Sequence, residues 1–152
     1  MSPIETIDHF YQAIIDKRVE DICLGYVLSE ETYVILEGPR YTTMGYEKIA
    51  KGWGDFCNSP LTLNKIAWVE GPFEEVSSDM AWVGGMIVLT VEVKEKEFAV
   101  QFRSTFVLRK NQENNWQIKH EHVSAPLEDP YGIGDWLKPV SSYQLSVCPV
   151  LK

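Results

Sequence analysis

The sequence predicts an α+β fold in which a curved antiparallel sheet forms a cone around N-terminal helices. Two observations predict it: apolar residues recur at helical spacing within the first 57 residues, and they alternate at period two from residue 61 to 124. At 152 residues, the chain is long enough for one domain with a real core, which we place at residues 1–125. We expect residues 126–152 to form a C-terminal tail packed on the same domain.

Three helices are expected before the main sheet. Ser2–Glu5 reads as a capping box with proline at the first helical position, which predicts a helix over residues 3–17. A short helix follows over residues 19–27. A third begins near Gly45, where the residues at helical spacing are Tyr46, Ile49, Ala50, Trp53, Phe56 and Cys57.

Period-two patterns predict strands over residues 61–70, 97–109 and 116–124, with Gly71-Pro72 ending the first of these. A β-rich run predicts a strand over residues 32–37, and a mostly apolar run predicts one over residues 80–94. The strand over residues 80–94 is apolar on both faces. One face can pack on the helices, and the other face then needs to be covered by something else. We assign the face that needs cover to Val83, Ile87, Leu89 and Val91. A second copy of the sheet is the simplest cover, which predicts a homodimer through the outer sheet face.

Charge and composition exclude several classes of partner. The net charge is −8 and no basic run is present, so neither nucleic acid nor an anionic membrane surface is an expected partner. The three cysteines have no metal-like spacing. The N-terminus enters a helix directly and lacks the pattern of a secretory signal, so we expect a cytoplasmic protein. No cofactor is expected.

The last predicted strand carries the most informative pattern. Read at period two, one face holds Trp116, Ile118, His120, His122 and Ser124. A face that changes from large apolar residues to imidazoles and a hydroxyl predicts a core that opens into a pocket with a polar end. Each histidine is either a general base or ligand donor, or a structural residue bonded to a serine or tyrosine. No metal is expected, because zinc would need a third protein ligand: His9 lies on the wet side of its helix, and nothing in the sequence beyond a guess at Glu37 supplies one.

Five stretches of the chain match a known pattern: Phe10-Tyr11 with Ala13, Gly45–Ile49 with Trp53, Asp79–Trp82, Arg103–Arg109 and Trp116–Ser124. With these residues the chain resembles the nuclear transport factor 2-like superfamily, and within it the SnoaL-like and ketosteroid-isomerase-like small proteins. The resemblance covers about residues 4–125. It implies a cone-like α+β barrel, also called a cystatin-like fold, with a pocket at its open end and commonly a dimer.

The resemblance also implies where isomerase chemistry would lie. Tyr11 falls at the position of a tyrosine that donates a hydrogen bond to the oxyanion in steroid isomerases. Their aspartate general base falls on Ile35, which cannot accept a proton, so we do not expect ketosteroid isomerase activity.

The sequence leaves three hypotheses for function. The first is a small-molecule binding protein whose pocket is lined by Trp53, Trp82, Phe102, Ser104 and Ser124, with Tyr11, His120 and His122 at its polar end. The second is an acid–base enzyme (a cyclase, isomerase, dehydratase or hydrolase) with His122 as proton acceptor, Tyr11 as donor and His120 beside them. The third is a dimeric interaction module whose cavity is incidental.

Overall fold

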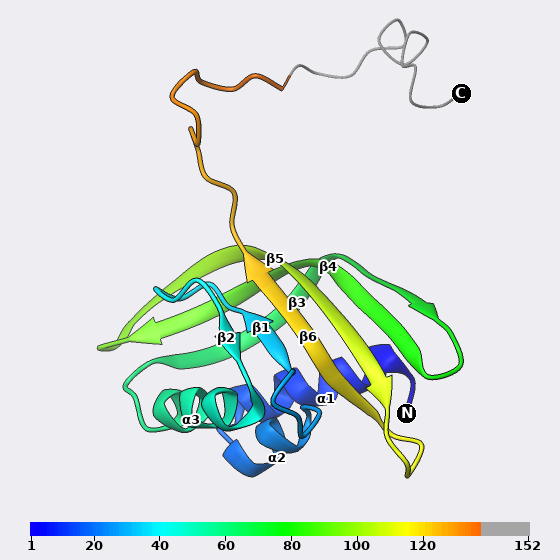
Figure 1. Cartoon of the computed structure of the whole chain (residues 1–152). Coiled ribbons are helices and arrows are strands. Elements are labelled where there is room, and N and C mark those ends of the chain that lie inside the picture. Colours follow the sequence, from blue (N-terminus) through cyan, green and yellow to red (C-terminus); the bar gives the residue numbers. More distant parts are fainter. Residues whose placement is uncertain (138–152) are drawn as a thin grey trace, which may run out of the picture.

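The computed structural model describes residues 1–137. Its elements are α1 (Pro3–Ile15), α2 (Val19–Leu24), β1 (Tyr33–Ile35), β2 (Thr43–Met44), α3 (Tyr46–Cys57), β3 (Thr62–Val76), β4 (Met80–Val93), β5 (Lys96–Lys110) and β6 (Trp116–Ser124). The strands form one six-stranded sheet in the order β2-β1-β6-β5-β4-β3. Figure 1 shows this sheet curving over the three helices, which all lie on one side of it. The predicted α+β fold is confirmed, with a sheet that is curved but not closed.

The first helix forms as its capping box predicts. The Ser2 hydroxyl accepts from the Glu5 amide at 3.1 Å, and the Glu5 carboxylate accepts from the Ser2 amide at 2.7 Å. Its buried stripe, which includes Ile7, Phe10 and Ile14, packs against the sheet, mainly on β3 and β4. The helix therefore supplies much of the core's helical wall.

The two faces of β4 are the reverse of the predicted assignment. Val83, Ile87, Leu89 and Val91 are all buried and belong to the core under the helices. The outward face instead carries Trp82, which is 38% exposed. The prediction was wrong because a strand that is apolar on both faces offers no period-two signal to orient it.

Strand β3 continues past the predicted break at Gly71-Pro72. It remains paired with β4 to Val76 by shifting register between Leu63 and Lys65 and on both sides of Glu70. Opposite these bulges lies Gly85, where an added Cβ would be 2.2 Å from the Glu70 carbonyl oxygen. The glycine therefore allows the close approach of the two backbones.

The described part of the tail, residues 125–137, is exposed throughout. Leu127 and Tyr131 are more than 70% exposed, and Figure 1 shows the segment leaving the end of β6 away from the barrel. The expected packing on the domain is therefore not found over residues 126–137, where prolines prevent β6 from continuing. Residues 138–152 lie outside the described part. Over residues 1–137, no helix has the length and apolar character to cross a membrane.

Candidate functional site

A β-bulge at Lys119 decides which side chains of β6 enter the interior. Val107 pairs with His120, but the next residue, Leu108, pairs with Ile118, so Lys119 has no partner on β5. The extra residue inverts the alternation of side chains. Trp116 and Ile118 stay inside as predicted, and they are followed there by Glu121 and Val123, all four being buried.

The two histidines consequently lie on the outer face, and their predicted place in the interior is wrong. His120 is half-buried; its Nδ1 is 2.8 Å from the Tyr33 carbonyl oxygen, and its ring stacks on that of Tyr33. His122 is exposed beside Thr105 and Ile35. Ser124 lies on the same outer face, opposite Arg103.

On the inner face of β6, the buried polar group is the carboxyl of Glu121, a residue that is only 2% exposed. The Tyr26 hydroxyl donates to its Oε1 at 2.5 Å and accepts from the Trp53 indole Nε1 at 2.9 Å. Tyr26 is held there by backbone bonds on both sides, from the Ile118 amide to the Gly25 carbonyl and from the Val27 amide to the Ile118 carbonyl. We call Glu121, Tyr26 and Trp53 the interior triad.

Burial makes this carboxyl a weak acid. It raises the pKa of Glu121 to about 8; the Tyr26 hydrogen bond opposes the shift, and the negative charge of Glu37 adds to it. Burial, followed by the charge of Glu121, also raises the pKa of Tyr26 well above its usual value. At neutral pH, Glu121 therefore holds its proton in most molecules.

A second buried polar pair contains two of the predicted site residues. The Tyr11 hydroxyl and the Ser104 hydroxyl are 2.9 Å apart, and both residues are buried on the inner side of the sheet. Burial raises the pKa of Tyr11 far above the usual tyrosine value, so it is a neutral donor or acceptor. The sequence-based prediction placed Tyr11 and Ser104 in the interior, where the structure has them. The two histidines, which were predicted to lie beside them, do not contact them.

A cavity of about 400 Å³ lies between α3, the loop after β1 and the start of β3. Its apolar walls are Val34, Leu36, Ile49, Trp53, Phe56, Leu61 and Leu63, and charged residues from the loop and α3 also line it: Glu37, Arg40, Lys48 and Asp55. Glu37 remains accessible to water, yet partial burial raises the pKa of its carboxyl. Such a hollow, mostly apolar with few polar groups, is typical of small-molecule sites.

Trp53 joins the cavity to the interior triad. It lines the cavity and also donates to Tyr26, as described above. Glu121 itself is not among the lining residues, although its neighbour in register on β1, Val34, is. A molecule in the cavity would thus contact the triad through Trp53 rather than through the carboxyl.

The other predicted ligand-binding aromatics do not line this cavity. Phe102 is half-buried and packs against the core on the inner face, opposite Ile87. Trp82 lies on the outer face between Val107 and Glu75, so its predicted interior position is wrong for the reason given for β4.

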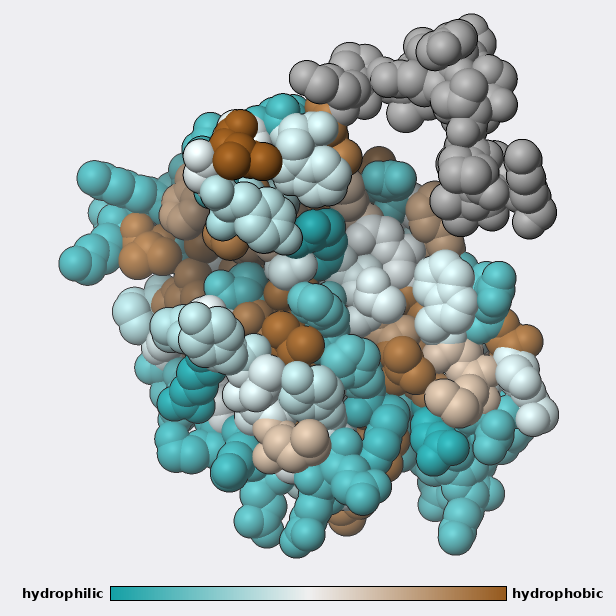
Figure 2. Space-filling model, turned by 45° about the horizontal axis from the view of Figure 1, so that its top comes forward, coloured by the Kyte–Doolittle hydropathy of each residue, from teal (hydrophilic) through white to brown (hydrophobic). Residues whose placement is uncertain are grey.

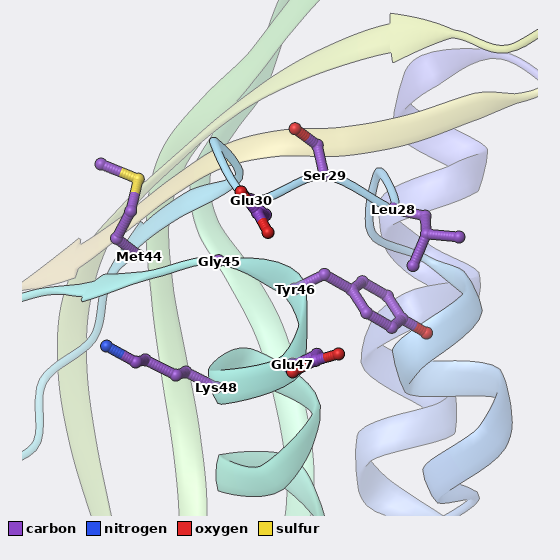
Figure 3. A pocket seen from close by; sticks show the side chains of 8 residues that line it. All are labelled: Leu28, Ser29, Glu30, Met44, Gly45, Tyr46, Glu47 and Lys48. Carbon is purple, nitrogen blue, oxygen red and sulfur yellow. The ribbon is translucent and has the colours of Figure 1, made fainter.

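A second hollow of about 400 Å³ lies at the start of α3, and Figure 3 shows the residues around it. Leu28 and Met44 on its rim are largely exposed. The labelled side chains of Tyr46 and Lys48 point in opposite directions rather than toward a common centre. Fewer apolar side chains line this hollow than line the cavity beside α3 and β3, so it is the weaker candidate for an apolar ligand. Within residues 1–137, no group of three or more histidine, cysteine or acidic residues is arranged to hold a metal ion.

Comparison with known proteins agrees with this architecture. The family model described as the SnoaL-like domain matches residues 4–128. The chain belongs to this SnoaL-like family. None of the curated proteins matches it.

Solved structures show the same fold. A nuclear transport factor 2-like superfamily protein from Salmonella enterica serovar Typhimurium is 22% identical with a TM-score of 0.70, over 86% of this chain and 93% of that one. A nuclear transport factor 2-like protein of unknown function from Pseudomonas putida is 19% identical with a TM-score of 0.67, over 89% and 92%. A ketosteroid isomerase-like protein from Erwinia carotovora is 17% identical with a TM-score of 0.65, over 80% and 93%. At these identities, the likeness shows that the SnoaL-like chain shares the fold of these proteins. Its activity has to be argued from the residues of its own site.

Sequence reasoning missed Glu121 and Tyr26 as site residues. One signal for Glu121 was present: Val123, an aliphatic residue, shares its face, which is unexpected for a face in water. Tyr26 had no signal of this kind, because its place depends on a bridge to Ile118 from a distant segment.

Proposed function

We propose that this SnoaL-like protein binds a small, largely apolar molecule in the cavity between α3, the loop after β1 and the start of β3. The observation that carries the proposal is the cavity itself, whose walls are mainly aliphatic and aromatic and whose charged groups come from the loop after β1 and from α3. Apolar walls supply affinity, and a few polar groups fix the orientation of the ligand.

Two glycines of α3 allow a matched test of this cavity. Gly52 lines it and Gly54 does not, and a Cβ added at either position meets no atom within 4 Å. Leucine at either position should stabilise the helix by about 1 kcal/mol relative to glycine. We therefore expect Gly52→Leu to fill the cavity without harming the fold, while Gly54→Leu leaves the cavity open.

The measurement is titration with 1-anilinonaphthalene-8-sulfonate, an anionic dye with an apolar aromatic part, followed by fluorescence. Gly52→Leu should weaken dye binding at least about tenfold, and Gly54→Leu should change it less than about twofold. Equal affinities in the two variants, with both folded by circular dichroism, would show that the dye does not occupy this cavity and would contradict the proposal.

A second candidate function is acid–base catalysis in the same interior, and the protonated Glu121 favours it. A carboxyl that keeps its proton near neutral pH is suited to donate it. In this version Glu121 gives its proton directly to a substrate that enters past Trp53, because the indole N–H only donates to Tyr26 and cannot relay a proton. His122, on the opposite face of the sheet, has no part in it.

Molecules that co-purify with the protein distinguish binding from catalysis. The wild type and Glu121→Gln should be expressed in the same cells, and their bound molecules extracted and identified by mass spectrometry. A binding protein holds the same molecule in both forms. An enzyme accumulates substrate in the variant only, so different molecules in the two forms would overturn the binding proposal in favour of catalysis.

We also infer that the outer sheet face joins two copies of this chain. Phe73, which is 53% exposed, and Trp82 support this, because they belong to neighbouring strands and face away from the helices. On the face of the molecule drawn in Figure 2, apolar side chains lie scattered among hydrophilic ones. Sedimentation should give a dimer at micromolar concentration, and a monomer would contradict this inference.

A further inference from the structure

The cavity beside α3 is lined by two cationic and two acidic side chains. Arg40 from the loop after β1 and Lys48 from α3 supply the cations, and Glu37 and Asp55 supply the carboxyls. Within residues 1–137, neither Arg40 nor Lys48 forms an ion pair with an acidic residue. Both cations are therefore available to a negatively charged group that enters the cavity.

The two acids do not balance these cations. The Asp55 carboxylate is 2.7 Å from the Lys51 Nζ, and Lys51 does not line the cavity, so the charge of Asp55 is offset from outside. Asp55 also follows Lys48 by two turns of the helix, which places it about 10 Å farther along the axis. Partial burial raises the pKa of the Glu37 carboxyl and so disfavours its charged form. In a chain whose net charge is −8, two cations here face at most one carboxylate that lacks an ion pair within the described residues.

The stability of its helix does not explain the position of Lys48. The residue is exposed and lies in the first turn of α3, which begins at Tyr46. The helix dipole disfavours a cation in the first turn and favours an anion there. A carboxylate held at Lys48 would offset this unfavourable placement.

The apolar walls and the two cations together define a class of ligand. Aliphatic and aromatic side chains such as Phe56, Leu61 and Leu63 surround much of the cavity, and its volume of about 400 Å³ suits a small molecule. Building on the binding function inferred above, we propose that this cavity binds an organic acid with an apolar body, whose carboxylate is held by Arg40 and Lys48.

The two cations can hold a carboxylate in different ways. The planar guanidinium of Arg40 can donate two parallel hydrogen bonds to one carboxylate, whereas the Lys48 ammonium acts as a compact charge. An uncharged ligand of the same shape would gain the apolar contacts but would leave both cations without a partner. The cavity should therefore distinguish a carboxylate from its neutral amide.

Isothermal titration calorimetry of the full-length protein with 2-naphthoate and 2-naphthamide tests the proposal, because the two probes share their shape and differ in charge. The wild type should bind 2-naphthoate at least about tenfold more tightly, since hydrogen bonds to a charged group are stronger than those to a neutral one. Arg40→Gln combined with Lys48→Gln should reduce this preference to less than about threefold and leave the affinity for 2-naphthamide unchanged.

Arg109→Gln combined with Lys96→Gln is the matched control. Both residues are exposed on β5 and neither lines the cavity, so this variant loses the same two charges elsewhere. It should keep the wild-type preference for 2-naphthoate. Gly52→Leu, which fills the cavity, should weaken the binding of both probes.

Equal affinities of the wild type for the two probes, both weakened by Gly52→Leu, would overturn this proposal and leave the cavity as a binding site for uncharged molecules. A preference for 2-naphthoate that persists in the variant lacking both cations would also overturn it, because the carboxylate would then lie elsewhere. If the wild type binds neither probe, this proposal and the proposed function both fail. A preference that is lost only with Arg40 and Lys48 supports the organic acid as ligand.

Discussion

Replacing Glu121 by glutamine should remove much of the loss of stability that the wild type shows as the pH rises. The pKa of Glu121 is raised from 4.5 to about 8 in the folded protein, so the folded state binds this proton more tightly than the unfolded chain. The stabilisation from this proton is complete below about pH 4.5 and is lost as the pH rises to about 8. Glutamine has the same shape, still accepts from Tyr26 and does not titrate.

The free energy of unfolding, measured in urea between pH 5 and 9, checks this expectation. At about 1.4 kcal/mol per pKa unit, the wild type should lose on the order of 3–5 kcal/mol more than Glu121→Gln across this range. Glu113→Gln, at an exposed carboxylate in the loop before β6, removes the same charge and should follow the wild type. Parallel pH profiles for the wild type and Glu121→Gln would refute the burial of this carboxyl.

Tyr26→Phe should be the more damaging of two single-hydroxyl deletions in the core. The Tyr26 hydroxyl donates to Glu121 and accepts from Trp53, so its loss leaves two polar groups without a partner. Such a loss costs about 1–3 kcal/mol while Glu121 is neutral, and about 3–5 kcal/mol when the buried carboxylate is charged. The cost should therefore grow from pH 6 to pH 9.

Tyr11→Phe is the matched control, because it deletes a buried hydroxyl from the other polar pair. There only the Ser104 hydroxyl loses its partner, so we expect a cost of about 1 kcal/mol that does not change over this pH range. Chemical denaturation of both variants at pH 6 and pH 9 gives the comparison. If Tyr26→Phe lowers the free energy of unfolding by the same amount at pH 6 and pH 9, then the Tyr26 hydroxyl is not hydrogen-bonded to a carboxyl that titrates in this range.

The fold could be predicted from the sequence because its signals are local. The capping box at Ser2 and the apolar spacing on α3 each specify a helix without reference to the rest of the chain. The alternation over β5 likewise put Ser104 and Phe106 on one face, and both are buried there. Where local pattern and tertiary structure agree, a single sequence suffices.

The site could be predicted only in part because two of its determinants are not local. The bulge at Lys119 exists only in relation to the register of β5, and Val123 hints at a change of face in β6 without fixing where it occurs. The bulge turns His120 and His122 to the outer face and Glu121 to the interior. One unpaired residue therefore decides which titratable groups the interior contains. The orientation of β4 fails for a related reason: both of its faces are apolar, and only the position of the helices decides which one is the core.

Carbon-13 NMR of the Glu121 carboxyl, followed from pH 4 to pH 10, most directly tests the claim that the bulge at Lys119 turns this side chain into the interior. We predict a midpoint near pH 8, because the carboxyl is buried with Tyr26 as its hydrogen-bond donor. A midpoint near 4.5, the ordinary value for a glutamate in water, would show that the side chain faces solvent and would contradict the structure of the site.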